Sequence, residues 1–213
     1  MRREQNIGFI LDWERVVTPV MDYILSEKVQ IVKKDQVVLI GNSMGGYLAA
    51  RAAAFEKRLA AVVLVDGVWD LYAAFARQFP SQLLATYDAG DHTQFDKKLL
   101  SLWESGKLST DAAWGLDQGL WSFQTLSPSD FLTQGRQYRL KNVVHKIDMP
   151  VFVGEGEYDD LTPGQGIEVK NALGKKATLY RFNRVAGYHC QTGALQELTR
   201  SMFAWTHKTL GIP

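Results

Sequence analysis

Cysteine is nearly absent from this chain, because Cys190 is the single cysteine in 213 residues. One cysteine excludes a disulfide framework within the chain and fits a reducing compartment, so we expect a cytoplasmic protein. The sequence also contains no CxxC pattern, no HExxH pattern and no glycine-rich phosphate loop. Since these patterns carry common zinc, redox and nucleotide sites, we expect neither a metal nor a cofactor.

Neither positive nor negative residues are in large excess, and long apolar runs are missing as well. The 24 lysines and arginines nearly balance 23 aspartates and glutamates, which leaves a net charge of +1 and argues against a polyanionic partner. No basic run interleaves with aromatic residues, and no apolar stretch approaches the roughly 18 residues of a membrane helix. Residues 1–6 have no apolar signal core behind their charges. We therefore expect no nucleic-acid partner and no membrane partner.

What the chain does contain is a Gly-x-Ser-x-Gly motif directly after four apolar residues, within 37–45. Small residues follow it, so we predict a buried strand, a sharp turn and a helix. Such a turn strains the backbone of Ser43, and we expect Gly41 and Gly45 beside it because side chains there would collide. We predict that Ser43 is a nucleophile and that the N–H of Met44 stabilises a developing oxyanion. The plainer alternative is a glycine-rich turn with an incidental serine.

Apolar runs without polar alternation predict a parallel sheet that is covered on both faces by helices. This pattern is typical of the α/β class, with a core formed by residues 1–68 and 147–213. Asp12 is expected to cap the first helix. The predicted strands are 37–40, 59–65, 151–154 and 178–182, and helices are expected near 13–25, 47–57, 165–173 and 194–210.

Residues 69–146 differ from the rest because they look helical and are rich in aromatic side chains. An insertion of this size between two strands of one sheet favours a helical lid over the site. Its aromatic side chains would then form an apolar substrate pocket, although most of them must simply be core. The residues that we expect at the pocket are Trp69, Tyr72, Phe75 and Trp121, together with Tyr188 from the core.

A serine needs a base that takes its proton and an acid that orients the base. His189 follows the last predicted strand and is the candidate base. Asp159 follows the third strand and is the preferred acid, with the adjacent Asp160 as the alternative. The outside candidates are Asp66 and Asp70, after the second strand. The order serine, acid, histidine at the carboxyl ends of strands is that of the α/β-hydrolase arrangement. Cys190 is expected to be a buried small side chain.

The segment 41–61, with Asp66-Gly67-Val68-Trp69-Asp70, resembles fungal polyketide-processing α/β-hydrolases. These include the heptaketide chain-shortening hydrolases, and dihydropseudooxynicotine hydrolase is a more distant relative. The resemblance spans almost the whole chain and includes residues 12–14 and 17–19. It implies that Ser43 is the nucleophile and His189 the base under a helical lid. It also implies cleavage of carbon–carbon bonds in β-diketone-like substrates, ester hydrolysis or acyl transfer.

The chain departs from that family in two places. Residues 161–163 are Leu-Thr-Pro where the family often has aromatic residues. A complete member also has about four strands and an oxyanion loop before the point where this chain starts. We therefore expect the strand at 37–40 to be an apolar, unpaired edge. The explanations are an N-terminally truncated fragment, a partner chain or second copy that completes the sheet, or a non-catalytic remnant.

Two functions follow from these patterns. The first is a serine hydrolase that acts on an acyl, ester or β-diketone bond of an aromatic or polyketide-like small molecule in secondary metabolism. Acyl transfer or cyclisation by the same acyl-enzyme is its variant. The second is a non-catalytic binding or assembly subunit whose sheet is completed by another chain.

Overall fold

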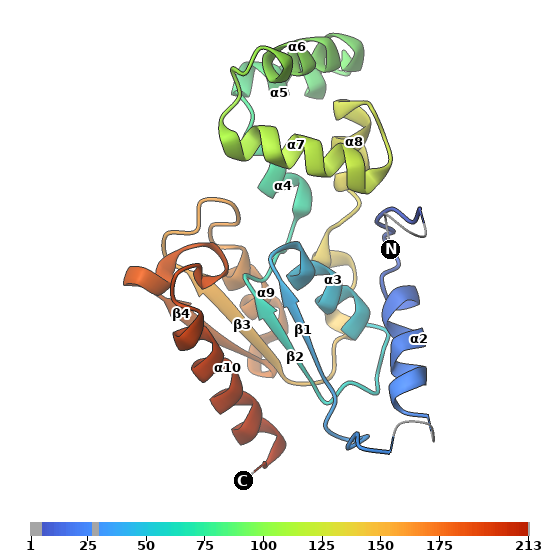
Figure 1. Cartoon of the computed structure of the whole chain (residues 1–213), viewed down its shortest axis with the longest axis vertical. Helices are drawn as coiled ribbons and strands as arrows, with labels where there is room; N and C mark the ends of the chain where they lie inside the picture. Colours follow the sequence, from blue (N-terminus) through green and yellow to red (C-terminus); the bar gives the residue numbers. More distant parts are fainter. Residues whose placement is uncertain (1–5, 27–29, 213) are drawn as a thin grey trace. The chain divides into compact units, whose positions relative to one another are not determined.

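The structure is a computed structural model, and it describes residues 6–26 and 30–212 (Figure 1). Residues 1–5, where the sequence shows no apolar signal core, lie outside this part of the chain. The chain divides into two compact units. The sheet unit comprises residues 12–69 and 139–212, and the helical unit comprises residues 70–138 together with residues 6–11.

The sheet unit is built on four parallel strands in the order β1-β2-β3-β4, as the apolar runs predicted. Every residue of β2 and β3 is buried, which explains why neither strand alternates with polar residues. The predicted α/β class, with a parallel sheet flanked by helices, is confirmed. The strands are β1 (Val38–Asn42), β2 (Ala61–Val65), β3 (Val151–Gly156) and β4 (Ala177–Phe182).

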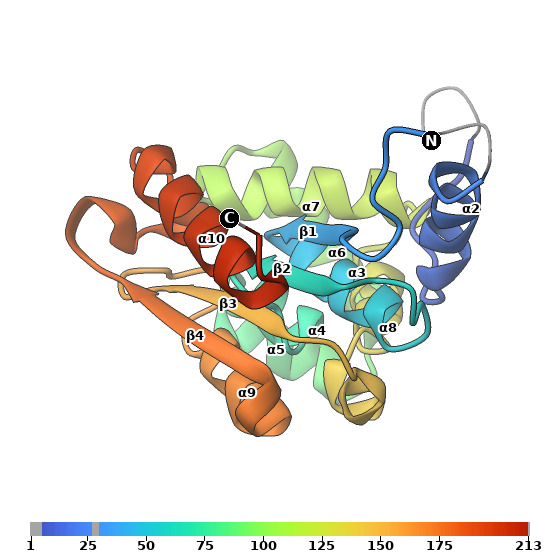
Figure 2. The same ribbon diagram turned by 90° about the horizontal axis from the view of Figure 1, so that it is seen from below.

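Helices cover both faces of this sheet, as Figure 2 shows from one end. On one face, α3 (Met44–Ala53) packs against β1 and β2, and α9 (Gln165–Leu173) packs against β3 and β4. On the other face, α10 (Leu195–Leu210) closes a core with alternate strand residues. That core consists of Ala61, Val63, Val65, Phe152, Phe182, Ala186, Leu198, Met202 and Trp205. Short 3-10 turns complete the unit at Leu140–Asn142, Val144–Lys146, Gly174–Lys176, Arg184–Gly187 and His189–Gln191.

The first described helix, α2 (Glu14–Ile24), is held against α3 by charge. The guanidinium of Arg51 donates to Glu14 at 3.0 Å and to Asp12 at 2.6 Å. The predicted cap is therefore wrong: Trp13 occupies the N-cap position, and the Asp12 carboxylate pairs with Arg51 instead. A charged partner in tertiary contact outweighs the local capping preference.

The helical unit contains α4 to α8 and an aromatic core of its own. Phe131 is fully buried there, with Phe75 at 4.8 Å and Phe123 at 5.4 Å between ring centroids. The sequence placed the insertion at 69–146, but residues after 138 belong to the sheet unit as 3-10 turns. The helices are α4 (Leu71–Ala76), α5 (Ser81–Asp88), α6 (His92–Glu104), α7 (Thr110–Phe123) and α8 (Pro128–Gly135).

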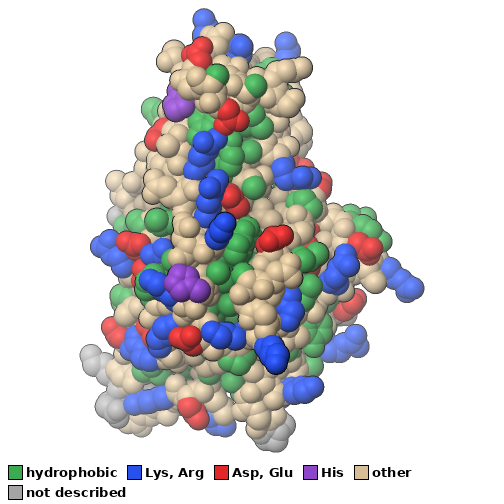
Figure 3. Space-filling view, turned by 180° about the vertical axis from the view of Figure 1, so that it is seen from behind, with side chains coloured by type: hydrophobic (Ala, Val, Ile, Leu, Met, Phe, Trp, Pro, Cys, Tyr) green, Lys and Arg blue, Asp and Glu red, His purple; other side chains and the backbone are tan. Residues whose placement is uncertain are grey.

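Strand β1 lies at one end of the described sheet, with β2 as its neighbour. Ile40 on this strand is 46% exposed, so an apolar side chain lies open at the edge. On the face drawn in Figure 3, basic and acidic side chains are interspersed, in keeping with the net charge of +1. Within residues 6–26 and 30–212, no helix combines the length and apolar character needed to cross a membrane.

Candidate active site

Ser43 lies in the turn between β1 and α3, with φ 55° and ψ −125°. A non-glycine residue in this region of backbone space is strained, and such strain is concentrated at functional sites. The turn is held by the Ser43 N–H, which donates to the carbonyl of Val65 at 2.9 Å. The next residue, Met44, is the first residue of α3, so its amide stands at the helix start as predicted.

The glycines of the turn have different roles from those the motif suggested. A Cβ on Gly41 would lie 1.9 Å from the carbonyl oxygen of Gly45, so the backbones meet there. A Cβ on Gly45 would meet nothing within 4 Å, whereas one on Gly46 would lie 2.7 Å from the Asp66 carbonyl oxygen. The predicted collision is thus confirmed at Gly41 and wrong at Gly45. The second close approach belongs to Gly46, because α3 runs against the end of β2.

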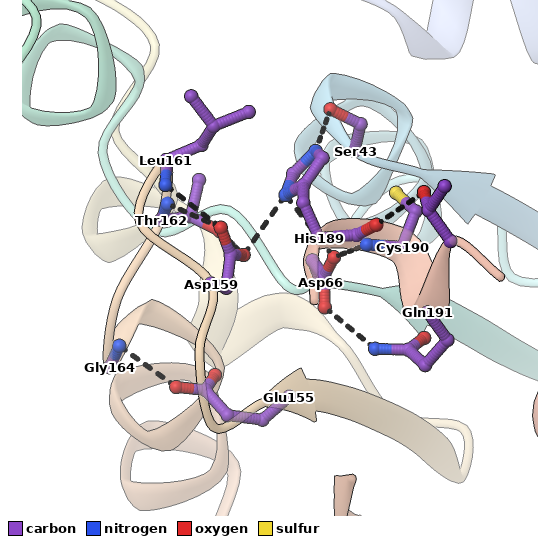
Figure 4. Close-up of polar contacts among 11 residues, drawn as sticks. Ser43, Asp66, Glu155, Asp159, Leu161, Thr162, Gly164, His189, Cys190 and Gln191 are labelled. Atoms are coloured by element: carbon purple, nitrogen blue, oxygen red, sulfur yellow. Dashed lines mark hydrogen bonds and ion pairs between the residues drawn. The ribbon is translucent and has the colours of Figure 1, made fainter. Parts of the chain in front are cut away.

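His189 contacts Ser43 although the two residues are 146 positions apart in the chain. Its Nε2 lies 2.7 Å from Ser43 Oγ, and its Nδ1 lies 3.0 Å from Asp159 Oδ2 (Figure 4). With the proton on Nδ1, the carboxylate accepts it and Nε2 is left to accept from the serine hydroxyl. The structure therefore brings the three predicted side chains into one hydrogen-bonded chain.

Asp159 is placed by its own loop after β3. Its Oδ1 accepts from the N–H of Leu161 at 2.9 Å and of Thr162 at 3.2 Å. Its Oδ2 accepts from the Thr162 hydroxyl at 2.6 Å as well as from His189. The carboxylate is buried, whereas the alternative acid Asp160 is exposed in the same turn. Geometry favours Asp159 as the partner of His189.

The site shifts the protonation equilibria of this pair in opposite directions. Burial alone would raise the pKa of Asp159, but hydrogen bonds from His189 and Thr162 hold that pKa below its usual value. Burial alone would lower the pKa of His189, but its hydrogen bonds to Asp159 and Cys190 hold that pKa above its usual 6.5. The pair therefore favours a charged carboxylate beside an imidazole that readily accepts a proton.

Asp66, an outside candidate for the acid, also lies at this site. Its Oδ2 is 3.3 Å from His189 Nδ1 and accepts from the backbone N–H of Cys190, while its Oδ1 accepts from the Gln191 amide at 3.2 Å. Burial raises the pKa of its carboxyl above the usual value. Asp70, the other outside candidate, instead caps α4 by accepting from the Ala73 N–H at 3.0 Å.

Among the described residues, one group has the chemical types of a metal site. Ligand atoms of Asp66, His189 and Cys190 lie within 4.8 Å of one another. The same nitrogen of His189 is engaged by Asp159, however, and the Asp66 carboxylate is engaged by backbone and amide donors. These contacts explain the cluster without an ion. Cys190 is half-buried rather than buried as predicted, and its backbone adopts φ 52° within the 3-10 turn.

The five predicted pocket residues are distributed over the two units. Trp69 and Tyr188 belong to the sheet unit, and the ring of Tyr188 lies 5.7 Å from that of Tyr158. The helical unit contains the other three: Phe75 in its core, Tyr72 under the Arg136 guanidinium, and Trp121. Trp121 is 44% exposed and lines a cleft within that unit with Trp103, Leu120 and Leu126. A common pocket and a lid role stay predictions.

Sequence reasoning missed two residues that hold the acid loop. Thr162 binds Asp159 through both its hydroxyl and its N–H. Glu155 is buried at the end of β3, and its Oε1 accepts from the Gly164 N–H at 2.8 Å, so it anchors the loop where α9 starts. A glutamate within an otherwise apolar strand was the available signal for Glu155, because a buried carboxylate needs donors nearby.

Known proteins resemble this chain over most of its length. A family model described as the alpha/beta hydrolase family matches residues 6–187. Hydrolase LUC6 of Fusarium sp. is 27% identical over 99% of this chain and 52% of its own length. The 20-hydroxy-prefusarin hydrolase FUS2 of Gibberella moniliformis is 26% identical over 94% of this chain and 50% of its own. The chain thus spans about half the length of these curated relatives.

Solved structures share the fold. The 2,6-dihydroxy-pseudo-oxynicotine hydrolase superposes with a TM-score of 0.68 at 18% identity, covering 95% of this chain and 48% of that one. The α/β hydrolase GrgF from Penicillium sp. sh18 gives a TM-score of 0.62 at 16% identity over 93% of this chain and 71% of that one. With the family match across most of the sequence, these similarities lead to one conclusion: the chain belongs to the alpha/beta hydrolase family.

Proposed function

We propose that this chain is a serine hydrolase in which Ser43 attacks a carbonyl carbon, His189 carries the proton and Asp159 orients His189. One observation carries the proposal: His189 Nε2 lies 2.7 Å from Ser43 Oγ while Nδ1 lies 3.0 Å from Asp159. The plainer alternative, a glycine-rich turn with an incidental serine, gives no reason for that alignment.

The reaction follows from these contacts. The Ser43 hydroxyl proton passes to His189 Nε2 as Oγ bonds to the carbonyl carbon, and the carbonyl oxygen becomes negative beside the Met44 N–H. His189 then returns the proton to the leaving group, which is an alcohol oxygen for an ester or the enolate carbon for a β-diketone. Water, deprotonated by His189, then attacks the acyl carbon, and His189 returns that proton to Ser43 Oγ as the carboxylic acid leaves.

The substrate class is an aromatic or polyketide-like molecule with an ester or β-diketone bond, in fungal secondary metabolism. Support comes from FUS2, whose name gives 20-hydroxy-prefusarin as its substrate, and from the aromatic side chains of the helical unit. In this proposal the helical unit acts as the lid. The single cysteine favours a cytoplasmic location. Acyl transfer or cyclisation would differ only in the nucleophile that resolves the acyl-enzyme.

The test is labelling of Ser43 by a fluorescent phosphonate, followed by peptide mapping. Wild-type protein and Ser105→Ala should be labelled, because Ser105 is exposed and its hydroxyl bonds to the carbonyl of Ser101. Ser43→Ala should lose the label together with hydrolysis of aryl esters and an aromatic β-diketone. Equal labelling of Ser43→Ala, or no labelling of the wild type, would refute the proposal.

A second candidate function is supported by the sheet edge. Because β1 is an edge strand of the described sheet and Ile40 is 46% exposed, a partner chain or a second copy could pair with this edge. The chain would then act as a binding or assembly subunit. Sedimentation separates the two functions, since an active monomer excludes the obligate-partner alternative.

A further inference from the structure

Two carboxylates, which follow different strands, converge on one nitrogen of His189. Asp159 Oδ2 lies 3.0 Å from Nδ1, and Asp66 Oδ2 lies 3.3 Å from the same atom. Figure 4 shows the imidazole with Ser43 on one side and both carboxylates on the other. A single acid is sufficient to orient a catalytic histidine, so the second carboxylate requires an explanation.

The position of Asp66 is fixed by its backbone conformation and by its hydrogen bonds. Its φ of 56° places it in the left-handed region, directly after β2, where few non-glycine residues occur. Only 2% of its surface is exposed. The backbone N–H of Cys190 and the side-chain amide of Gln191, itself fully buried, both donate to its carboxylate. The residues directly after His189 therefore hold this carboxylate against the imidazole.

A purely structural role does not account for a carboxylate here. An asparagine could accept from the Cys190 N–H through its oxygen and donate to Gln191 Oε1, which has no hydrogen-bond partner in the described structure. A buried carboxylate is costly unless a positive charge compensates it. The charged groups and the titratable thiol that face the His189 ring among the described residues are Asp159, Asp66 and Cys190. The compensating charge is that of the imidazolium.

We propose that Asp66 is a second positioning carboxylate for His189, sharing the Nδ1 proton with Asp159. This inference rests on the proposed function. When Ser43 gives its proton to Nε2, the imidazolium is held between two oxygens, and the Nδ1 proton remains on the ring. Each carboxylate can keep the productive tautomer when the other is lost. Asp66 can therefore orient His189 when Asp159 is replaced.

The main experiment compares Asp66→Asn, Asp159→Asn and the double variant by the rate of phosphonate labelling of Ser43 from pH 5 to 10. The double variant should lose about 10⁴ in rate, the loss that is typical when the histidine has no carboxylate. Asp159→Asn alone should remain at least about tenfold faster than the double variant, with non-additive effects. Asp66→Asn alone should shift the profile to lower pH, which loss of a merely structural contact would not do.

Two control variants each remove a carboxylate that is close in sequence to Asp159 or to Asp66. Asp160→Asn changes the exposed neighbour of Asp159, and Asp70→Asn keeps the cap of α4 because asparagine caps equally well. Both should label at the wild-type rate with an unchanged pH profile. If Asp159→Asn were as slow as the double variant, and Asp66→Asn had the wild-type profile, the proposal would be overturned.

A measurement that needs no activity separates this inference from the proposed function. The ring nitrogen NMR signals of His189 report its pKa directly in the full chain. Asp66→Asn should lower that pKa by at least about one unit, a tenfold change in the proton equilibrium. A lowered pKa without labelling of Ser43 would refute the proposed serine-hydrolase function but still support the interaction between Asp66 and His189. An unchanged pKa would refute the role of Asp66 even in an active enzyme.

Discussion

At the scale of single residues, the site depends on which atoms face the imidazole of His189. Ser43 lies in a strained turn beside the imidazole. Asp159 accepts from three donors besides His189: two amides and one hydroxyl. The result is a charged carboxylate and a histidine that binds its proton tightly.

Activity should rise with pH. His189 must be neutral to accept the serine proton, and its pKa lies above the usual 6.5. The kcat/KM of aryl ester hydrolysis should therefore be low near pH 6 and increase with an apparent pKa above 6.5. The same shift stabilises the fold fully below pH 6.5 and progressively less as pH rises through the raised pKa. A profile that is flat from pH 6 to 9 would contradict the assignment of His189 as base.

Thr162→Val should slow the enzyme. The substitution keeps the side-chain shape but removes the hydroxyl that donates to Asp159 at 2.6 Å. Hydrogen bonds to charged groups contribute about 1.5–3 kcal/mol, so kcat/KM should fall by about tenfold or more. Thr162→Ser retains the hydroxyl and should stay within about threefold of wild type. Equal rates for the valine and serine variants would show that this hydroxyl does not hold the acid.

At the scale of elements, the turn between β1 and α3 positions Ser43, the nucleophile that we propose. Two backbones meet at Gly41, whereas Gly45 has open space beside its Cα. The motif contains glycine at both places, but only the tertiary structure reveals which glycine is sterically required. Substitution by alanine should therefore have opposite effects at the two positions.

Gly41→Ala should destabilise the chain by about 3 kcal/mol or more, because a Cβ 1.9 Å from the Gly45 carbonyl oxygen must push β1 and α3 apart. Gly45→Ala should be neutral or stabilise by up to about 1 kcal/mol, since alanine favours a helix. Thermal unfolding followed by circular dichroism measures both. Similar midpoints for the two variants would mean that the turn differs from the one described.

At the scale of the whole molecule, the chain consists of two compact units, and it passes from one to the other at 11–12, 69–70 and 138–139. The segments at 69–70 and 138–139 are adjacent, since Leu140 N–H donates to the Trp69 carbonyl at 2.9 Å. A short bridge could therefore close the sheet unit without distorting it.

Replacing residues 71–138 with a flexible linker of about four residues should leave a sheet unit that folds and still labels at Ser43. Our reason is that Ser43, Asp159 and His189 all belong to that unit. Circular dichroism and phosphonate labelling test this, with the linker variant carrying Ser43→Ala as the control. Loss of selectivity among aromatic substrates, with labelling kept, would support the lid. Failure to fold would show that the helical unit is needed for stability.

The sequence by itself determined the strands, the turn at Ser43 and the order of the serine, the acid and the histidine, because these depend on local apolar runs and turn residues. It favoured Asp159 over Asp160 but left Asp160 open, since adjacent side chains in a loop point in different directions and only packing selects one.

Tertiary structure alone decided the rest. Asp66 and His189 are 123 positions apart in the chain, and they meet because parallel strands end at the same edge of the sheet. Trp13 rather than Asp12 is the N-cap residue of α2, because the Asp12 carboxylate pairs with Arg51, a residue distant in the chain. Local patterns specify elements, but contacts between distant residues depend on register and packing, which no short stretch of sequence contains.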